Sequence, residues 1–193
     1  QEIRQALMFH NFQNGQLSIA LHMRRGHVSV LSTLKLHDKE SGAFSLLESE
    51  AVHQFEVYER VVRIEVSHIM DTHKFVVLLD GSLPYSQYDK VSTNLIRIQM
   101  PHATNLETFA ILTQSFIAAS NSSQFYIYRV HPTKLETVAH YGSRGRLLSL
   151  HPLVYGPNHY LLAVGDQRQG IYIFDESSST WKGSAYINKK GIR

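Results

Sequence analysis

Twelve histidines occur in this chain of 193 residues, and two of them lie in a pattern that could bind a metal ion. His68, Asp71 and His73, in the segment HIMDTH, offer imidazole and carboxylate donors of the kind that bind zinc. Residues five apart on a strand point to opposite faces unless a turn intervenes, and no third ligand can be named. The pattern therefore favours solvated loop histidines, and we predict no metal site and no cofactor.

The motifs of the common enzyme classes are missing from the sequence. Cysteine is absent, which excludes a thiol nucleophile, a thiolate zinc site and a disulfide framework. No Gly-x-Ser-x-Gly elbow, phosphate-binding loop or dinucleotide fingerprint occurs. The serine-rich segments ASNSSQ and DESSSTW have the composition of turns. We predict that the chain is not an enzyme.

Two segments carry residues suited to binding a partner protein. Arg24 and Arg25 precede Gly26-His27, so they could form a basic hairpin tip that meets an acidic partner, with a solvated turn as the alternative. The other segment, GSLPYSQYDKVSTN at 81–94, contributes three candidates: Tyr85, Tyr88 and Asp89. Trp181 is aromatic as well, but we expect it to be a core residue of an outer strand.

Charge and modification signals bear on the partner and the compartment. The formal charge is +3, but the nineteen Lys and Arg residues are scattered, which predicts no nucleic-acid partner. The longest apolar runs are too short to cross a membrane. Asn121-Ser122-Ser123 is an acceptor sequence for N-glycosylation at an expected exposed turn. The ends at Gln1 and at the basic NKKGIR favour a processed segment of a larger protein, with an expression boundary as the alternative.

The candidate residues named above lie in or between short apolar runs in which side chains alternate with a period of two. Phe125 to Val130 and Ile171 to Phe174 are rich in β-branched and aromatic residues and are bounded by Ser, Gly, Asn and Asp, which is typical of strands. No window has a sustained helical stripe with caps at both ends. The sequence predicts an all-β protein.

The strands recur at a fixed interval. FVVLLD ends at Asp80, FIAASN at Asn121 and LLAVGD at Asp166, so the polar ends lie 41 and 45 residues apart. That spacing, with four strands per interval, is typical of the blades of a β-propeller. We expect the three polar residues to lie in the turns between second and third strands, bonding their own backbone and tolerating a left-handed conformation.

We therefore predict a β-propeller segment of about four antiparallel four-stranded blades. The expected blades cover residues 1–60, 61–106, 107–145 and 146–193, and the first of them matches the repeat loosely. The segment 81–94 is about ten residues longer than its counterparts and is expected to join the second and third strands of its blade. Four blades do not close a ring of six to eight, so other sequence or other chains are expected to complete it.

The segment LETFAILTQSFIAASNSSQFYIYRV resembles the epitempin (EAR) repeats of extracellular seven-bladed propellers. The resemblance covers roughly residues 60–187, although Val130 stands where the family has tryptophan. The matching residues are Glu107, Phe109, Phe116, Ala119, Asn121, Ile127, Tyr128 and Arg129. It implies a secreted, non-catalytic glycoprotein that binds receptor ectodomains or matrix.

WD40-like propellers are the rival resemblance. LLAVGDQRQGIYIFD fits their pattern with Phe174-Asp175 in place of the tryptophan pair, but no repeat opens on Gly-His. This resemblance implies a cytoplasmic scaffold in a multi-protein assembly. Under either one, the expected partners are other proteins, including companion subunits or the rest of the same chain.

Overall fold

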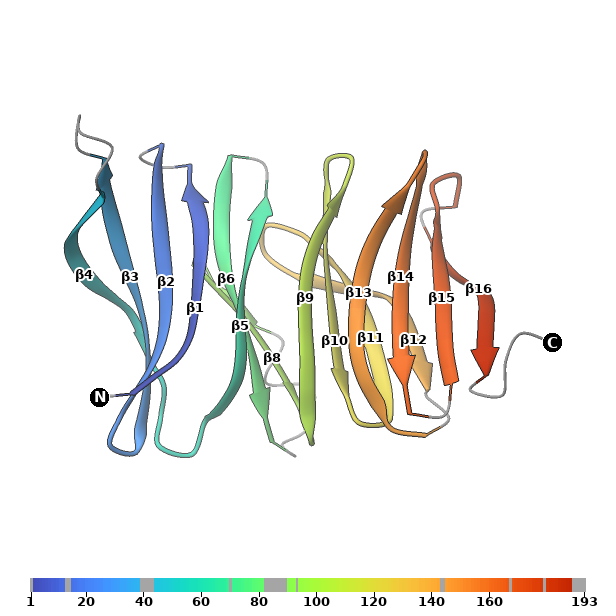
Figure 1. The fold of residues 1–193 in the computed structure, drawn as a ribbon, viewed down its shortest axis with the longest axis horizontal. Coiled ribbons are helices and arrows are strands. Elements are labelled where there is room, and N and C mark those ends of the chain that lie inside the picture. The colour runs from blue at the N-terminus through green and yellow to red at the C-terminus, as the bar shows by residue number, and fades with distance from the viewer. Residues whose placement is uncertain are drawn as a thin grey trace.

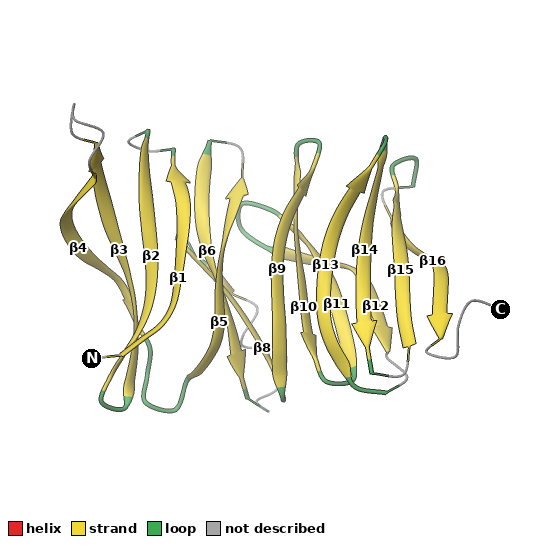
Figure 2. Cartoon of the chain, viewed as in Figure 1, coloured by secondary structure: helices red, strands yellow, loops and turns green. Residues whose placement is uncertain are grey.

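A computed structural model of the chain describes residues 2–12, 15–38, 44–69, 71–81, 90–92, 94–142, 145–166, 168–178 and 180–188. These residues form strands and connecting turns (Figure 2). No helix long and apolar enough to cross a membrane occurs among them. The strands make four separate four-stranded sheets, which confirms the predicted all-β architecture of blade-like units.

Three of the sheets are antiparallel meanders in chain order. Sheet 1 consists of β1 (Glu2–Asn11), β2 (Gln16–Arg25), β3 (Val28–Asp38) and β4 (Phe44–Gln54). Sheet 3 consists of β9 (Ala103–Ile111), β10 (Gln114–Asn121), β11 (Gln124–Val130) and β12 (Leu135–Gly142). Sheet 4 consists of β13 (Leu147–Tyr155), β14 (Asn158–Gly165), β15 (Arg168–Asp175) and β16 (Thr180–Asn188).

Sheet 2 departs from the meander. Its strands are β5 (Arg60–Ile69), β6 (Thr72–Asp80), β7 (Lys90–Val91) and β8 (Leu95–Met100), in the spatial order β5-β6-β8-β7. β8 takes the third place, as predicted, but it pairs with β6 in parallel. The expected antiparallel blade is therefore wrong at this one pairing. The segment 81–94 holds the outer strand β7 and is not a simple second-to-third connection.

The four sheets stack in a row from the N-terminal sheet to the C-terminal sheet (Figure 1). The first strands lie next to one another, with β9 between β5 and β13 and β1 beside β5. Sheets 1 and 4 lie at opposite ends of the row and do not meet, so the stack is open. This arrangement matches consecutive blades of an unclosed propeller.

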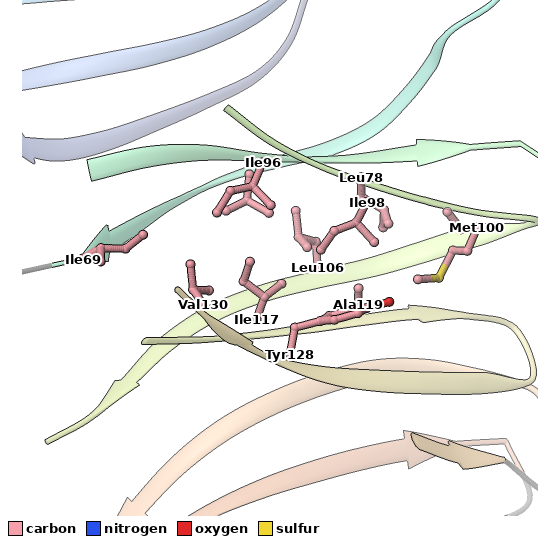
Figure 3. Close-up of a cluster of buried hydrophobic side chains, with 12 residues drawn as sticks. Ile69, Leu78, Ile96, Ile98, Met100, Leu106, Ile117, Ala119, Tyr128 and Val130 are labelled. Carbon is pink, nitrogen blue, oxygen red and sulfur yellow. The ribbon is translucent and has the colours of Figure 1, made fainter. Parts of the chain in front are cut away.

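An apolar cluster fills each of the three spaces between neighbouring sheets. Strand alternation sends Phe75, Val77 and Leu79 toward sheet 1, and it sends Val76 and Leu78 toward sheet 3. Figure 3 shows the second group packed with residues of β8 to β11. Inner strands of sheets 2 and 3 are therefore buried on both faces, which explains their continuous apolar runs. A third cluster, around Phe116 and Trp181, joins sheets 3 and 4.

Polar side chains also join neighbouring sheets through the backbone of β5. Gln5 of β1 donates from Nε2 to the oxygen of Ile64 and accepts from its nitrogen, both at 2.8 Å. From sheet 3, Thr108 Oγ1 donates to the oxygen of Val66 at 2.9 Å, and Ser115 Oγ donates to the oxygen of His68. β5 is the edge of its sheet, so these bonds satisfy backbone groups that have no strand partner.

The first sheet is regular, and one expected limit between sheets needs correction. The first 60 residues hold a regular sheet with strands of 10 or 11 residues, although they match the repeat only loosely. The expected limit at 106/107 falls inside β9, because Thr104 and Asn105 belong to the strand and reach Ser120 Oγ at 3.2 and 3.0 Å. Sheet 3 instead begins just after His102, where a φ of 56° makes a tight turn.

Candidate binding site

One end of the stack collects the connections that lead into the first strands. β5, β9 and β13 all begin there, at the lower edge in Figure 1, and β6, β10 and β14 end there. We call it the entry end. The turn between β2 and β3, at Gly26-His27, lies at the same end.

A cavity of about 1020 Å³ opens between sheets 1 and 2 at the entry end. The cavity exists because the face of sheet 1 that lies toward sheet 2 changes along β2 from apolar to polar side chains. Ala20 on this face belongs to the apolar cluster, whereas His22 and Arg24, at the next two positions of the alternation, line the cavity. Polar side chains that keep contact with water cannot fill the space as apolar ones do.

The cavity wall is rich in arginine. The lining residues are Arg4, Gln5, His22, Arg24, His27, Ser29, Val57, Glu59, Arg60, Val61, Val62, Arg63, Asp80 and Ala103. Both carboxylates among them are engaged by guanidinium groups. Glu59 Oε1 lies 2.9 Å from Arg97 Nη1, and Asp80 Oδ2 lies 3.2 Å from Arg60 Nη1.

Arg24 is differently placed from these paired arginines. Its Nε donates to the oxygen of Gly26 at 3.0 Å, and no carboxylate of the described residues lies within salt-bridge distance of it. The turn thus fixes the guanidinium group at Nε, and the residue is exposed. Arg24 is a cation available to a ligand.

A second hollow of about 680 Å³ continues from the first toward sheets 3 and 4. The two share Arg60, Asp80 and Ala103, and the second adds the exposed Arg146 from the connection before β13. The backbone N–H of Arg146 donates to Asp166 Oδ1 at 2.9 Å, which holds this connection in place. We call the two hollows together the basic basin.

The pKa of His22 reflects its surroundings in the basin. Burial lowers the pKa of His22, and the nearby positive charge of Arg4 lowers it further. Its Nε2 lies 3.2 Å from Ser29 Oγ. The shift therefore reports mainly the burial of His22, with a smaller contribution from the positive charge of Arg4.

The innermost wall carries a compact charge network. Arg63 Nε lies 3.1 Å from Glu65 Oε1, and Arg63 Nη2 lies 3.7 Å from Glu107 Oε1. Burial raises the pKa of both carboxyl groups, and Arg63 opposes that shift in each. The network links the first strands of sheets 2 and 3, so we assign Arg63 mainly to holding them together.

The structure separates the two arginines predicted for the β2–β3 hairpin tip. Arg24 lines the basin, but Arg25 is the next residue of the strand and points to the opposite face of sheet 1. Tyr85, Tyr88 and Asp89 lie outside the described residues, so their assignment stays a prediction.

The expected exposure of Asn121 is wrong. Only 4% of the residue is exposed. Its Oδ1 accepts from the backbone nitrogens of Ser123 and Gln124, at 2.9 and 3.0 Å. This is the predicted bonding of a turn residue to its own backbone. Glycosylation of Asn121 stays a prediction, but a glycan needs room that this buried amide does not have.

Asp80 and Asp166 also accept backbone hydrogen bonds, but the N–H groups they accept from belong to other connections of the chain. Asp80 Oδ1 accepts from the backbone nitrogen of His102 at 2.8 Å, and Asp166 accepts from that of Arg146. They therefore bond the connections that enter first strands, not their own turns. Nor is a left-handed conformation used at either one, since among described non-glycine residues only His102 and Leu112 have positive φ.

His68 and His73 face each other across the β5–β6 hairpin, because the turn intervenes between them. No group of three or more metal-binding side chains occurs among the described residues. Trp181 is buried in the cluster between sheets 3 and 4, which confirms its predicted place in the core of an outer strand.

Sequence reasoning missed most of the basin. Arg60, Arg63 and Arg146 were not singled out, and neither was His22. A signal was present for the strand residues: RVVRIEV puts charges in a run that a propeller must place near its axis. Arg146 carried no such signal, since it lies in a polar connection.

Comparison with known proteins does not assign the chain to a family. No family model matches the sequence, and no curated protein matches it.

Proposed function

We propose that this chain is a non-catalytic, protein-binding segment of a β-propeller. The observation that carries the proposal is the outer face of sheet 4. From Tyr160 to Gly165 in β14 and from Gln169 to Phe174 in β15, half-exposed residues that face away alternate with buried ones that face sheet 3. The outward apolar residues are Leu153, Tyr160, Leu162, Val164, Ile171 and Ile173.

This outward face corresponds to faces that are covered elsewhere in the stack. Val76 and Leu78 of sheet 2 pack on sheet 3, and Phe116 and Ala118 of sheet 3 pack on sheet 4. The outer face of sheet 4 continues that series, and no other sheet of the described residues covers it. An exposed apolar surface of this kind is typical of an interaction site. Its occupant in the proposal is a further β-sheet, from the rest of the same chain or from a companion subunit.

The far face of sheet 1 supports the same reading more weakly. Met8 is 71% exposed there and Ile3 is 62% exposed, whereas Leu21, Met23 and Val30 on this face are buried. Both ends of the stack therefore offer apolar surface, with sheet 4 offering the more continuous one.

The compartment is proposed from resemblance. The epitempin-like phrases favour a secreted glycoprotein, and the alternative is a WD40-like cytoplasmic scaffold. Detection of the endogenous protein in medium or in cytosol, with an antibody raised against this chain, distinguishes the two.

Self-association tests the binding face. For an isolated chain in solution, the β-sheet that can cover the outer face of sheet 4 comes from another copy of the chain. We expect sedimentation velocity to show association that increases with concentration. Leu153→Glu and Leu162→Glu should abolish it, since each places a charge on the outer face of sheet 4. Leu112→Glu is the matched control, because Leu112 is 76% exposed in a turn away from that face. A chain that stays monomeric at 100 μM or so and binds no apolar dye would overturn the proposal.

A further inference from the structure

The basic basin at the entry end carries a second inference, independent of the outer face of sheet 4. Its charges come from segments far apart in sequence: Arg4 in β1, Arg24 in β2, Arg60 and Arg63 in β5, and Arg146 before β13. Five arginines thus line one continuous hollow that contains two carboxylates. Only the stacking of the sheets brings them together.

Three of the five arginines are paired with carboxylates: Arg4 with Glu2 at 2.9 Å, Arg60 with Asp80, and Arg63 with Glu65 and Glu107. Glu59 is held by Arg97, which is not among the lining residues, and Asp80 is held by Arg60 and by the backbone of His102. Arg60 is itself 79% exposed at the junction of the two hollows, so a competing anion can reach its guanidinium. Arg24 and Arg146 have no carboxylate partner of their own among the described residues.

We propose that the basic basin binds an acidic peptide segment of a partner protein, with its carboxylates at Arg24 and Arg146. Guanidinium groups bind carboxylates through paired, charge-assisted hydrogen bonds. Because Arg60 lines both hollows, a segment that binds at Arg24 and at Arg146 passes over Arg60.

The remaining wall favours a peptide over a uniform polyanion. Val57, Val61 and Val62 add apolar surface to the larger hollow. Arg24 lines only the larger hollow and Arg146 only the smaller one, so the intervening charges of a polyanion such as a sulfated polysaccharide would meet arginines already paired with carboxylates. A peptide can alternate carboxylates with apolar side chains and so match both parts of the wall.

Fluorescence polarisation with a labelled peptide of alternating Glu and Val residues tests the proposal. We expect saturable binding by the 193-residue chain that weakens with added salt, and no binding of the matched Gln–Val peptide. Arg24→Gln and Arg146→Gln should each weaken binding about tenfold, because each removes a charge-assisted contact.

Arg25→Gln provides the matched control. Arg25 is exposed, adjacent in sequence and equal in charge to Arg24, but it points away from the basin. It should leave binding unchanged. Equal losses from Arg24→Gln and Arg25→Gln would reduce the effect to net charge and overturn the proposal.

Two more outcomes decide the ligand class and the independence of the site. Binding of a heparin fragment without binding of the Glu–Val peptide would overturn the peptide assignment and leave a polyanion site. Leu162→Glu should not affect peptide binding, because it lies on the outer face of sheet 4. Thermal melts show whether each variant folds. If Arg24→Gln fails to fold, Arg146→Gln in the second hollow still tests the basin.

Discussion

The sequence at Asn121 predicts a glycosylation site, whereas in the structure its side chain stabilises a turn. Its carboxamide oxygen accepts two backbone N–H groups of the β10–β11 turn while the residue is almost wholly buried. Ser122 O in the same turn accepts from the nitrogen of Leu147, at the start of sheet 4. The turn therefore supports the junction of two sheets.

Asn121→Ala should lower the free energy of unfolding by about 1–2 kcal/mol, because two backbone donors lose their acceptor. Urea denaturation measures the change. Asn121→Asp is the control, since it keeps the acceptor oxygen and removes the glycosylation sequence. A loss as large in Asn121→Asp as in Asn121→Ala would mean that the hydrogen bonds are not the cause.

Leu112 has a φ of 54° in the β9–β10 turn and exposes 76% of its surface. A branched side chain in the left-handed region is strained, and little packing offsets that strain here. Leu112→Gly should therefore raise the free energy of unfolding by about 1 kcal/mol. Leu112→Ala removes the same packing but keeps Cβ, so an equal gain in that variant would contradict the conformational explanation.

Three histidines make stability depend on pH. Burial lowers the pKa of His22, His53 and His73 in the folded chain, so the unfolded chain binds their protons more tightly. The free energy of unfolding should then fall as pH drops below about 6.5, the ordinary histidine value. Glu65 and Glu107 act in the opposite sense, because burial raises their pKa and the fold favours their protonated forms.

Comparing variants isolates the histidine contribution. Urea midpoints between pH 7.5 and 5.5 should fall less for His22→Gln and His73→Gln than for the parent chain, because glutamine does not titrate. Parallel pH profiles for all three proteins would show that these histidines do not control the dependence.

At the scale of the element, the first strands depend on side chains from other sheets. Gln5 joins β1 to the backbone of Ile64 through two hydrogen bonds, and Ile64 is fully buried. Gln5→Leu should cost about 1–3 kcal/mol, because it leaves both backbone groups of Ile64 unpaired. Hydrogen exchange should quicken first in sheet 1. Met8→Leu, on the opposite face of β1, should change neither quantity.

The element scale also shows what sequence can specify. Period-two alternation located the strands of sheets 3 and 4, since one register alone buries their apolar faces. It could not orient β8, because the alternation that buries Ile96, Ile98 and Met100 on one face is the same in either strand direction. The limit near 106/107 was misplaced for a related reason: Thr104 and Asn105 are turn-forming types, but here they pair with Ser120 inside the sheet.

At the scale of the molecule, the described residues of each sheet pack against those of the neighbouring sheets in the row. The 41- and 45-residue spacings predicted blade-like units. Each sheet buries its apolar faces against its neighbours, so each repeats the same pattern of apolar strands and polar turns. The basin could not be predicted in this way. Its arginines come from four segments, at Arg4, Arg24, Arg60 to Arg63 and Arg146, and the proximity of these segments follows from stacking, which no local pattern encodes.

The parallel pairing of β6 with β8 has a consequence for the order of folding. Hairpins such as β9–β10 close over two residues, whereas each residue of β8 pairs with one 20 positions earlier. Loop-closure entropy delays this step, and Ile96, Ile98 and Met100 cannot join the cluster with sheet 3 until it is complete. The middle of the stack is thus its slowest part to form. Doubling the length of segment 81–94 should slow refolding about threefold in stopped-flow fluorescence, while the same insertion after Tyr155 should not.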